Sequence, residues 1–444
     1  MIQPNIPDNG QARIVIVGGG FGGISLAKQL KNSPFQIVLL DRNNYHLFQP
    51  LLYQVATAGL EPESIAFPLR GIFNKQKNLH FRMAEVKKVR PDDNMLETSI
   101  GEVRYDYLVL ATGSNTNFFG NKNIEAHAVG MKSLIEAVQI RNYVVKQFEE
   151  ALLMPTEEDI KPKLNFVMVG GGPTGVELAG AFAELKQYIL PKDYPELPLH
   201  LMNIYLIEAG PRLLAAMSEE SSRKTEAGLR KIGVHVLCNV AVKEYDGNVL
   251  QLSNGDTIQS QSLLWSAGVK GVPIEGLPAD ALIPNGRILV DEYNLVKGCK
   301  NIYTLGDAAQ MTNDPAFAKG YPMVAQVAIQ QGKNLGINLE AARKNQRSSW
   351  KPFKYKDLGS MATIGRNRAV AEVGGMKLSG FLAWMTWMVV HLMTLMGFRN
   401  KLVVFTNWFY RYFTYDRGTR IIIKRGAANI TKLRQIVQDT RYHG

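Results

Sequence analysis

Short runs of apolar residues that end at glycines recur along the chain and predict strands buried on both faces of a parallel sheet. The first run covers residues 14–17. A predicted helix over residues 24–30 follows, and then a second apolar run, residues 35–40, that ends at Asp41. Between the first run and the helix, three glycines form the pattern G-x-G-x-x-G: Gly18, Gly20 and Gly23. The order of strand, glycine loop, helix and strand predicts a Rossmann-like unit.

Each glycine in such a loop has its own physical role. The first allows a tight turn, the second lets a pyrophosphate approach the backbone, and the third lets the helix pack against the strand. The N-terminal N–H groups of the helix favour the phosphates, and an acid such as Asp41 can accept hydrogen bonds from a ribose hydroxyl. One glycine loop alone is also compatible with a plain tight turn.

The same arrangement occurs a second time. An apolar run over residues 164–169 precedes a predicted helix over 176–185, and a later strand over 204–207 ends at Glu208. The second set of glycines is Gly170, Gly172 and Gly175. Two copies predict two dinucleotides, one a mobile nicotinamide and one a resident flavin. A carboxylate at Glu208 favours NADH over NADPH because it repels a 2′-phosphate, although the nearby Arg212 weakens this preference.

Small residues and one acid end further predicted strands. Thr112 and Gly113 follow the run 105–110, Gly268 follows 263–265, and Asp307 follows 302–305. Small residues let a ligand approach the backbone closely. The Asp307 carboxylate is expected either to hold a ribityl hydroxyl or to cap the next helix. A further helix is predicted over 325–338, and it places Gln326 and Gln330 on one face, near whatever Asp307 contacts.

The C-terminal region is strongly apolar and aromatic. Of residues 378–396, 14 of 19 are apolar, which is nearly enough for a membrane-spanning helix, but polar residues recur every two turns. In the next segment, 401–415, one face is polar (Asn400, Asn407, Arg411 and Thr414), and aromatic residues occupy much of the rest. This pattern favours an interfacial membrane anchor. A spanning helix, a soluble core helix or a dimer interface are the alternatives.

Composition limits the remaining choices. The 444 residues, 46% hydrophobic and 20% charged, are enough for two or three folded domains. Residues 155–163 are polar and predict a linker between the two nucleotide units. Cys238 and Cys299 form no C-x-x-C and no metal pattern, which indicates a reducing compartment, no metal site and no redox cysteine pair. Residues 1–12 are polar and do not predict a secretory signal. The net charge is +12, and residues 397–444 hold ten Lys and Arg against two Asp, or +8. A basic tail favours nucleic acid or an anionic membrane surface, and the apolar content of this tail favours the membrane.

At this point the chain resembles the two-dinucleotide-binding-domain flavoprotein reductases, and within them the type II NADH dehydrogenases, which are single-chain, non-pumping NADH:quinone oxidoreductases. The motif A-Q-x-A-x-Q-Q-G and the tail are its specific parts. The segments that carry the resemblance are 18–23 with Asp41, 45–59, 111–113, 170–177, 305–309, 325–332, and Lys377 with the aromatic tail.

The resemblance implies an α/β fold with two Rossmann-like dinucleotide-binding domains and a C-terminal anchoring region of amphipathic helices. Its implied parts are an FAD-binding domain over 1–125 and 296–377, an NADH-binding domain over 126–295, and a membrane anchor over 378–444. FAD would be held by Gly18, Gly20, Gly23, Asp41 and Asp307, and NADH by Gly170, Gly172, Gly175 and Glu208. Further cofactor-binding candidates are Gly22, Thr112, Gly113, Gly268 and Ala325.

The resemblance also implies the catalytic residues. Glu177 would handle protons near the flavin and quinone, while Gln326, Gln330 and Lys377 would line the quinone site. Structural alternatives are an acid favoured by a helix dipole for Glu177 and an ordinary surface lysine for Lys377.

The expected partners are menaquinone or ubiquinone, an anionic membrane surface and a second copy of the chain, without nucleic acid. The expected location is the cell membrane, peripheral on its cytoplasmic face. Rival hypotheses are a soluble NAD(P)H reductase serving an iron–sulfur protein, and a flavin-bearing sensor whose basic tail binds nucleic acid. A sulfide:quinone reductase would need redox cysteines.

Overall fold

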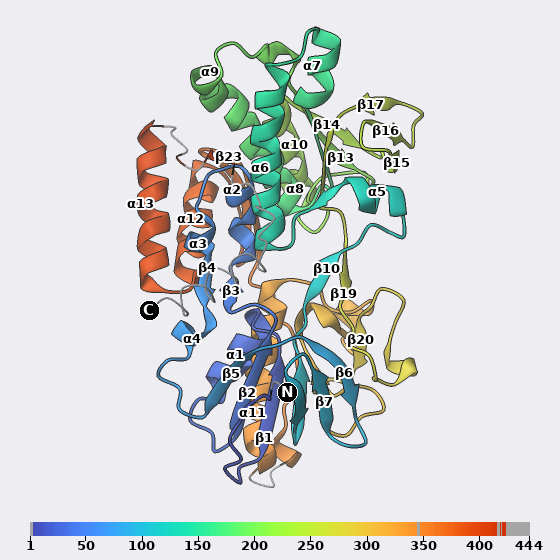
Figure 1. The fold of residues 1–444 in the computed structure, drawn as a ribbon, viewed down its shortest axis with the longest axis vertical. Helices are drawn as coiled ribbons and strands as arrows, with labels where there is room; N and C mark the ends of the chain where they lie inside the picture. The colour runs from blue at the N-terminus through green and yellow to red at the C-terminus, as the bar shows by residue number, and fades with distance from the viewer. Residues whose placement is uncertain (1–2, 344–346, 415–417, 419, 423–444) are drawn as a thin grey trace, which may run out of the picture.

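The computed structural model describes residues 3–343, 347–414, 418 and 420–422, which form two lobes (Figure 1). Each lobe is built on a five-stranded parallel sheet. The first sheet has the order β21 (Ile302–Thr304), β9 (Tyr107–Leu110), β1 (Arg13–Val17), β2 (Gln36–Asp41) and β5 (Leu79–Met83). The second has the order β11 (Val129–Gly130), β18 (Ser262–Trp265), β12 (Asn165–Val169), β13 (Asn203–Glu208) and β14 (Val234–Cys238). The predicted α/β fold with two Rossmann-like units is confirmed.

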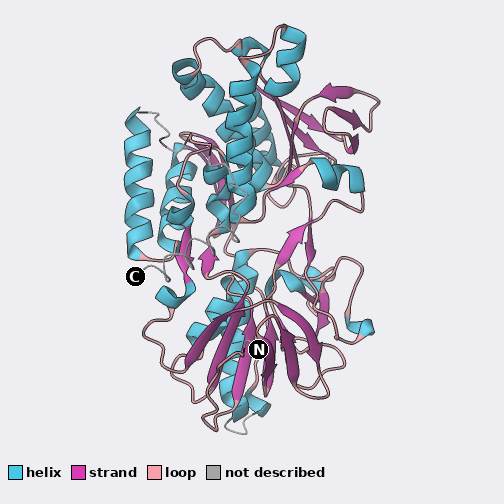
Figure 2. Cartoon of the chain, in the orientation of Figure 1, coloured by secondary structure: helices cyan, strands magenta, loops and turns pink. Residues whose placement is uncertain are grey.

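Helices cover both sheets, and Figure 2 shows them beside the strands. In the first lobe, α1 (Phe21–Gln29) packs on α11 (Ala325–Arg343), and a Cβ on Gly332 would lie only 2.6 Å from the Gly22 carbonyl oxygen. Glycines therefore allow these two helices to touch backbone to backbone. In the second lobe, the long helices are α6 (Leu134–Ala151), α8 (Pro173–Glu184) and α10 (Glu219–Lys231).

Two antiparallel strands join the lobes. β10 (Ser114–Thr116) leads out of the first lobe and β19 (Val269–Gly271) leads back, and they pair with each other (Figure 1). After β19 the chain rejoins the first lobe, where Ile274 and Ile288 are buried in one cluster with Val15. The predicted NADH-domain boundary at 295 therefore lies beyond this return, because residues after Gly271 pack on the first sheet.

The predicted linker over 155–163 is wrong. These residues include most of α7 (Glu157–Leu164), which begins at Thr156, whose Oγ1 accepts from the Asp159 N–H at 3.2 Å. Acidic residues in its first turn favour the helix dipole. The linker prediction depended on the lack of apolar periodicity in this segment. Capping and charge form the helix without that periodicity.

A small antiparallel sheet and two helices end the described chain. The strands are β23 (Ser360–Gly365), β24 (Arg368–Val373) and β25 (Met376–Gly380), and the helices are α12 (Phe381–Thr394) and α13 (Phe398–Thr414). The apolar run over 378–396 is thus not one helix, because 378–380 complete β25 and Gly380 has φ +71°. None of the helices in the described part of the chain has the length and hydrophobicity needed to cross a membrane.

The remaining strands and α-helices are short. They are β3 (Tyr45–Leu47), α2 (Leu52–Ala56), α3 (Pro62–Ile65), β4 (Ala66–Pro68), α4 (Leu69–Ile72), β6 (Val86–Arg90), β7 (Met95–Thr98), β8 (Gly101–Arg104), α5 (Lys122–His127), α9 (Leu190–Asp193), β15 (Val242–Tyr245), β16 (Val249–Leu252), β17 (Thr257–Gln259), β20 (Ile288–Val290) and β22 (Ala309–Met311).

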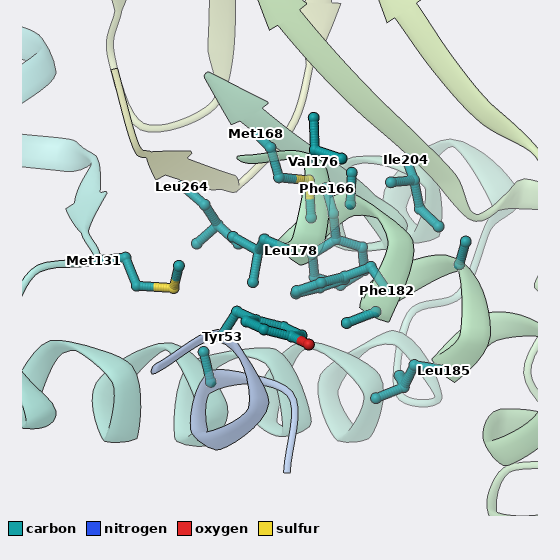
Figure 3. Packing of buried hydrophobic residues seen from close by; sticks show 14 of the residues in the cluster. Tyr53, Met131, Phe166, Met168, Val176, Leu178, Phe182, Leu185, Ile204 and Leu264 are labelled. Atoms are coloured by element: carbon teal, nitrogen blue, oxygen red, sulfur yellow. The ribbon is translucent and has the colours of Figure 1, made fainter. Parts of the chain in front are cut away.

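The largest buried cluster brings α2 against the second lobe. Tyr53 of α2 lies against Leu178 and Phe182 of α8 (Figure 3). Burial of these side chains stabilises the contact by roughly 1.5–3 kcal/mol each. Segment 45–59 of the first nucleotide unit is therefore held at the junction of both lobes.

Candidate functional site

The first glycine loop has the backbone that a pyrophosphate requires. Gly18 has φ +112°, and a Cβ there would collide with the Ala111 carbonyl. A Cβ on Gly23 would collide with the Gly18 carbonyl, so α1 packs directly on the turn. At Gly20, by contrast, no described atom lies within 4 Å of a Cβ, and this residue is the N-cap of α1. The loop leaves open backbone at the N-terminus of the helix, which fits a dinucleotide phosphate.

The second loop repeats this geometry. Gly170 has φ +111°, and its Cβ would lie 2.8 Å from the Ala267 nitrogen. A Cβ on Gly175 would collide with the Gly170 carbonyl, while one on Gly172 meets no atom within 4 Å in the described structure. Gly172 is the N-cap of α8. Each glycine thus has the conformation or the packing that its predicted role requires.

The acids at the strand ends hold these loops closed. Asp41 Oδ2 accepts from the Gly19 N–H at 2.6 Å, and Glu208 Oε2 accepts from the Gly171 N–H at 2.5 Å. Burial raises the pKa of Asp41, and the backbone N–H groups that it accepts from oppose this shift. Both acids lie where a ribose is expected. Each also bonds to its glycine loop, a structural role that the sequence pattern did not indicate.

The guanidinium of Arg212 is engaged by its own loop. Its nitrogens donate to the Met217 carbonyl at 2.8 Å, the Ser222 hydroxyl at 2.6 Å and the Ala215 carbonyl at 2.9 Å. These bonds hold the guanidinium within residues 212–222, whereas the Glu208 carboxylate bonds to the second glycine loop at Gly171, beside the expected ribose. This arrangement favours NADH over NADPH.

Asp307 connects three segments that are distant in the sequence. Its Oδ2 accepts from the Ser114 hydroxyl at 2.5 Å and lies 3.5 Å from the ammonium of Lys132 in the second lobe. The Lys132 backbone is itself fixed, because its N–H donates to Glu136 at 2.9 Å. No sequence pattern indicated Lys132 as part of this site. The S-x-x-E capping box beginning at Ser133 was a signal for where the helix starts, but not for this contact.

The other cofactor candidates lie around the same junction. Thr112 donates to the Val272 carbonyl at 2.8 Å, and Gly113 and Gly268 have φ +72° and +70° beside the crossing strands. Ala325 begins α11, and a Cβ on Gly22 would collide with Leu305. Gly113 and Gly268 therefore occupy turns that favour glycine at the points where the lobes meet.

Gln326 and Gln330 attach residues 355–359, here called the strap, to α11. Both amides bond to residues 355–359: Gln326 Nε2 donates to the Gly359 carbonyl at 3.0 Å, and Gln330 Nε2 donates to the Lys356 carbonyl at 2.8 Å. Their amide oxygens accept from the same strap, at Leu358 and Lys356. The two glutamines share a face of the helix as predicted, and their amides are used in this contact. Their role toward a quinone stays a prediction.

Lys377 lies apart from these residues. It is exposed on β25, pairs in register with Glu372 of β24, and its charge acts on Glu372 and Glu220. The β-hairpin directs it to the outer surface, so the structure does not bring Lys377 to Glu177.

Glu177 lines a cavity between α8, α2, β23 and both C-terminal helices. The cavity has about 820 Å³ of empty space, part of which is open to solvent. Its aromatic lining residues are Tyr53, Tyr188, Trp384, Trp387, Trp408 and Tyr412. An apolar cavity with a few polar groups is typical of a small-molecule site.

The Glu177 carboxyl is nearly buried, with 7% of its surface exposed. Its Oε1 accepts from the Trp387 Nε1–H at 3.1 Å and from the Thr363 N–H at 3.4 Å. Burial raises the pKa of Glu177 to about 8, and the two donors only partly oppose this shift. Most of the carboxyl is therefore protonated at pH 7, so it can donate a proton to a molecule in the cavity.

Most of the polar face of α13 contacts protein: Asn400, Asn407 and Arg411 bond to residues of the first unit, whereas Thr414 is exposed. Trp408 Nε1 donates to Gln54 at 2.8 Å, Asn407 donates to Glu61 at 2.8 Å, and Arg411 donates to the Gly59 carbonyl. Burial lowers the pKa of Arg411, and Glu184 opposes this shift. The amphipathic pattern was recognised correctly, but its polar side attaches the tail to segment 54–61 of the first unit, which is far away in the sequence.

Comparisons with known proteins agree along the chain. Residues 12–332 match the pyridine nucleotide-disulphide oxidoreductase family, and residues 358–415 match the NDH2 C-terminal domain. The type II NADH:quinone oxidoreductase Ndh of Mycobacterium tuberculosis is 33% identical, with 98% of this chain and 96% of that protein covered. The internal alternative NAD(P)H-ubiquinone oxidoreductase A1 of Solanum tuberosum is 30% identical, with 89% and 85% covered.

Solved structures share the fold. NDH2 from Plasmodium falciparum, in complex with NADH, has a TM-score of 0.84 at 22% identity and covers 93% of this chain and 100% of its own. The sulfide:quinone oxidoreductase of Aquifex aeolicus has a TM-score of 0.67 at 20% identity, with 95% of each chain covered. Two glycine loops of matching geometry, a tail domain of the NDH2 type and full-length relatives at 33% identity together mean that the chain belongs to the type II NADH:quinone oxidoreductases.

Proposed function

We propose that this protein oxidises NADH at the second glycine loop and reduces menaquinone or ubiquinone in the cavity beside Glu177, with FAD held by the first loop. The observation that carries the proposal is the aromatic cavity itself, because it joins a protonated carboxyl to helices with exposed apolar faces. A lipid-soluble quinone can enter such a cavity without crossing water.

Each glycine loop binds one of the two dinucleotides in this proposal. The open backbone at Gly20 suits the FAD pyrophosphate, and Asp41 and Asp307 would accept from its hydroxyls. The open backbone at Gly172 suits NADH, with Glu208 at its adenine ribose. A bound flavin supplies the two-electron relay between a nicotinamide and a quinone. The segment around Tyr53 is packed between the lobes.

Glu177 supplies a proton to the quinone. Reduction to the quinol adds two electrons and two protons. The hydride that NADH gives up accounts for the two electrons and one proton, and a neutral carboxyl within reach of a quinone oxygen can donate the second proton. After donation, the Trp387 and Thr363 N–H groups stabilise the carboxylate left behind. Solvent then returns the proton. The proposed reaction includes no pumping of protons across the membrane.

The tail helices attach the protein to an anionic membrane surface on the cytoplasmic face. Their outer residues are apolar and exposed, including Met393 at 67% and Phe398 at 83%. An apolar face of this kind indicates a membrane or a partner, and the proposal includes a homodimer. Arg399 and Lys401 lie beside it, where anionic lipids would attract them. Half of the net charge of +8 counted over 397–444 lies outside the described residues. The proposal assigns no nucleic acid to this tail.

The test separates the two half-reactions. Purified protein in mild detergent is mixed anaerobically with NADH or NADPH, and a short-chain quinone is then added while flavin absorbance is followed. We expect rapid bleaching with NADH and recovery with the quinone. Glu177→Gln should keep the bleaching and slow the recovery, while the exposed control Glu125→Gln changes neither. Bleaching without recovery by any quinone would favour the soluble-reductase alternative.

A further inference from the structure

Four side chains from distant parts of the sequence form one hydrogen-bond network in the wall of the Glu177 cavity. Trp408 Nε1 donates to Gln54 Oε1 at 2.8 Å, and Gln54 Nε2 donates to the Tyr53 hydroxyl at 3.0 Å. The hydroxyl oxygens of Tyr53 and Thr363 lie 3.2 Å apart and share a hydrogen bond. All four residues line the cavity, and none is more than 9% exposed.

The direction of each hydrogen bond follows from what the groups can donate. An indole nitrogen only donates, so the amide oxygen of Gln54 faces Trp408 and its NH₂ group faces Tyr53. Burial raises the pKa of Tyr53, so this hydroxyl keeps its hydrogen at neutral pH. Since the Tyr53 oxygen accepts from Gln54, its hydrogen is directed to the oxygen of Thr363.

One hydroxyl hydrogen is then left over. Tyr53 and Thr363 carry two hydroxyl hydrogens, and the bond between them uses one. Among the described residues, neither hydroxyl has a further acceptor. A buried donor without an acceptor is unfavourable, so the hydrogen left over, that of Thr363, indicates a ligand with an acceptor atom.

The Glu177 carboxyl is the neighbour of this hydroxyl. The Thr363 N–H donates to Glu177 Oε1 at 3.4 Å, and the Trp387 indole donates to the same oxygen at 3.1 Å. Because Oε1 already accepts two hydrogen bonds, the proton of the neutral carboxyl belongs on Oε2. Glu177 and Thr363 thus provide two neighbouring O–H donors, which suit a carbonyl oxygen with its two lone pairs.

We propose that the Thr363 hydroxyl is a second hydrogen-bond donor to the quinone and that Tyr53 holds it in this direction. The inference rests on the proposed function and adds a residue to its site. Glu177 and Thr363 bind the same quinone oxygen, on which negative charge develops during reduction, and a donor fixed in advance stabilises that charge. Glu177 transfers its proton, whereas Thr363 keeps its own. Tyr53 and Gln54 are positioning residues that act through Thr363.

The test measures quinone-driven flavin recovery at saturating menadione, after anaerobic bleaching with NADH, in the full-length protein in mild detergent. Thr363→Val keeps the shape of the side chain without the hydroxyl, so recovery should slow at least about tenfold while bleaching is unchanged. Thr363→Ser restores the hydroxyl and should restore most of the rate. Thr257→Val, an exposed control that also lies in a strand, should change neither step.

Tyr53→Phe tests the positioning role. It removes the hydrogen bond that directs the Thr363 hydroxyl, so it should also slow recovery. Because Tyr53 acts through Thr363, the double variant Tyr53→Phe/Thr363→Val should be no slower than Thr363→Val alone. The double variant also leaves no hydroxyl without a partner, so it replaces Thr363→Val if that variant fails to fold, and it should show the same loss against the wild type.

Infrared spectra of menadione bound to the oxidised protein separate a hydrogen bond to the quinone from a general structural effect. The quinone C=O band should lie at lower frequency in the wild type than in Thr363→Val. An unchanged band, wild-type recovery in Thr363→Val, or additive losses from Tyr53→Phe and Thr363→Val would each overturn the inference and leave the proposed function standing. Absence of recovery in the wild type with any quinone would overturn the proposed function and this inference with it.

Discussion

The substitution Glu177→Gln tests the central residue of the cavity. Glutamine keeps the size of the side chain and an oxygen that can accept from Trp387 and Thr363, but it never ionises. The ordinary pKa of a glutamate is 4.5, and burial raises that of Glu177 to about 8. The folded protein therefore holds this proton more tightly than the unfolded chain does.

The sign and size of the stability effect follow from this difference. The contribution of the protonated carboxyl is fully present below pH 4.5 and is lost as the pH rises through 8. The loss is about 1.4 kcal/mol for each pH unit between these values, which amounts to about 3 kcal/mol at pH 7 and about 5 kcal/mol above pH 8. Glutamine avoids this loss, so the variant should be more stable than the wild type at alkaline pH and not at pH 4.

Two assays follow the same proton. Thermal unfolding of the wild type and Glu177→Gln from pH 5 to 9 should show a difference that grows with pH, and Glu125→Gln serves as the control. Infrared spectroscopy of the wild type should show a protonated carboxyl C=O band at pH 7 that is missing in Glu177→Gln and disappears near pH 8. The reasoning is refuted if the stability difference is independent of pH, or if the band titrates near 4.5.

The same change should affect catalysis in one half-reaction. Losing a general acid costs about 10²–10⁴-fold in rate. We therefore expect quinone-driven flavin recovery to slow by at least about a hundredfold in Glu177→Gln, and to decline above pH 8 in the wild type. Bleaching by NADH should remain. Equal slowing of both half-reactions would mean that Glu177 acts on the flavin environment and not on the quinone.

Three further predictions concern the loops and the tail. Gly175→Ala should lower the free energy of unfolding by about 1–3 kcal/mol, because its Cβ collides with Gly170. Gly172→Ala should keep the unfolding temperature of the wild type but bind NADH at least about tenfold more weakly. Equal unfolding temperatures of the two variants would contradict the assigned roles. Glu208→Gln should raise the NADPH-to-NADH ratio of kcat/KM about tenfold in steady-state assays, and an unchanged ratio would remove Glu208 from nucleotide choice. Phe405 and Phe409 are 47% and 60% exposed. Replacing both with aspartate should reduce sedimentation with anionic vesicles about a hundredfold or more, while turnover of a water-soluble quinone persists. Unchanged sedimentation would exclude this face as the anchor.

The sequence by itself determined the features whose requirements are local. Gly18 and Gly23 are five residues apart, and one turn explains both the positive φ of the first and the close packing of the second. The alternation of apolar runs with these loops was therefore enough to predict two Rossmann-like units, and the carboxyl ends of the strands were enough to locate Asp41 and Glu208. The amphipathic pattern of the tail likewise identified α13.

Only the tertiary structure decided which chemistry these residues can perform. Trp387 reaches Glu177 across 210 positions of the chain, and Lys132 reaches Asp307 from the other lobe. Lys377 shows the converse, because its hairpin turns it to the surface. A pKa depends on how completely neighbours remove water from a group and on which donors remain within reach. Those neighbours come from segments far apart in sequence, so the protonated Glu177 emerges only when the chain is folded.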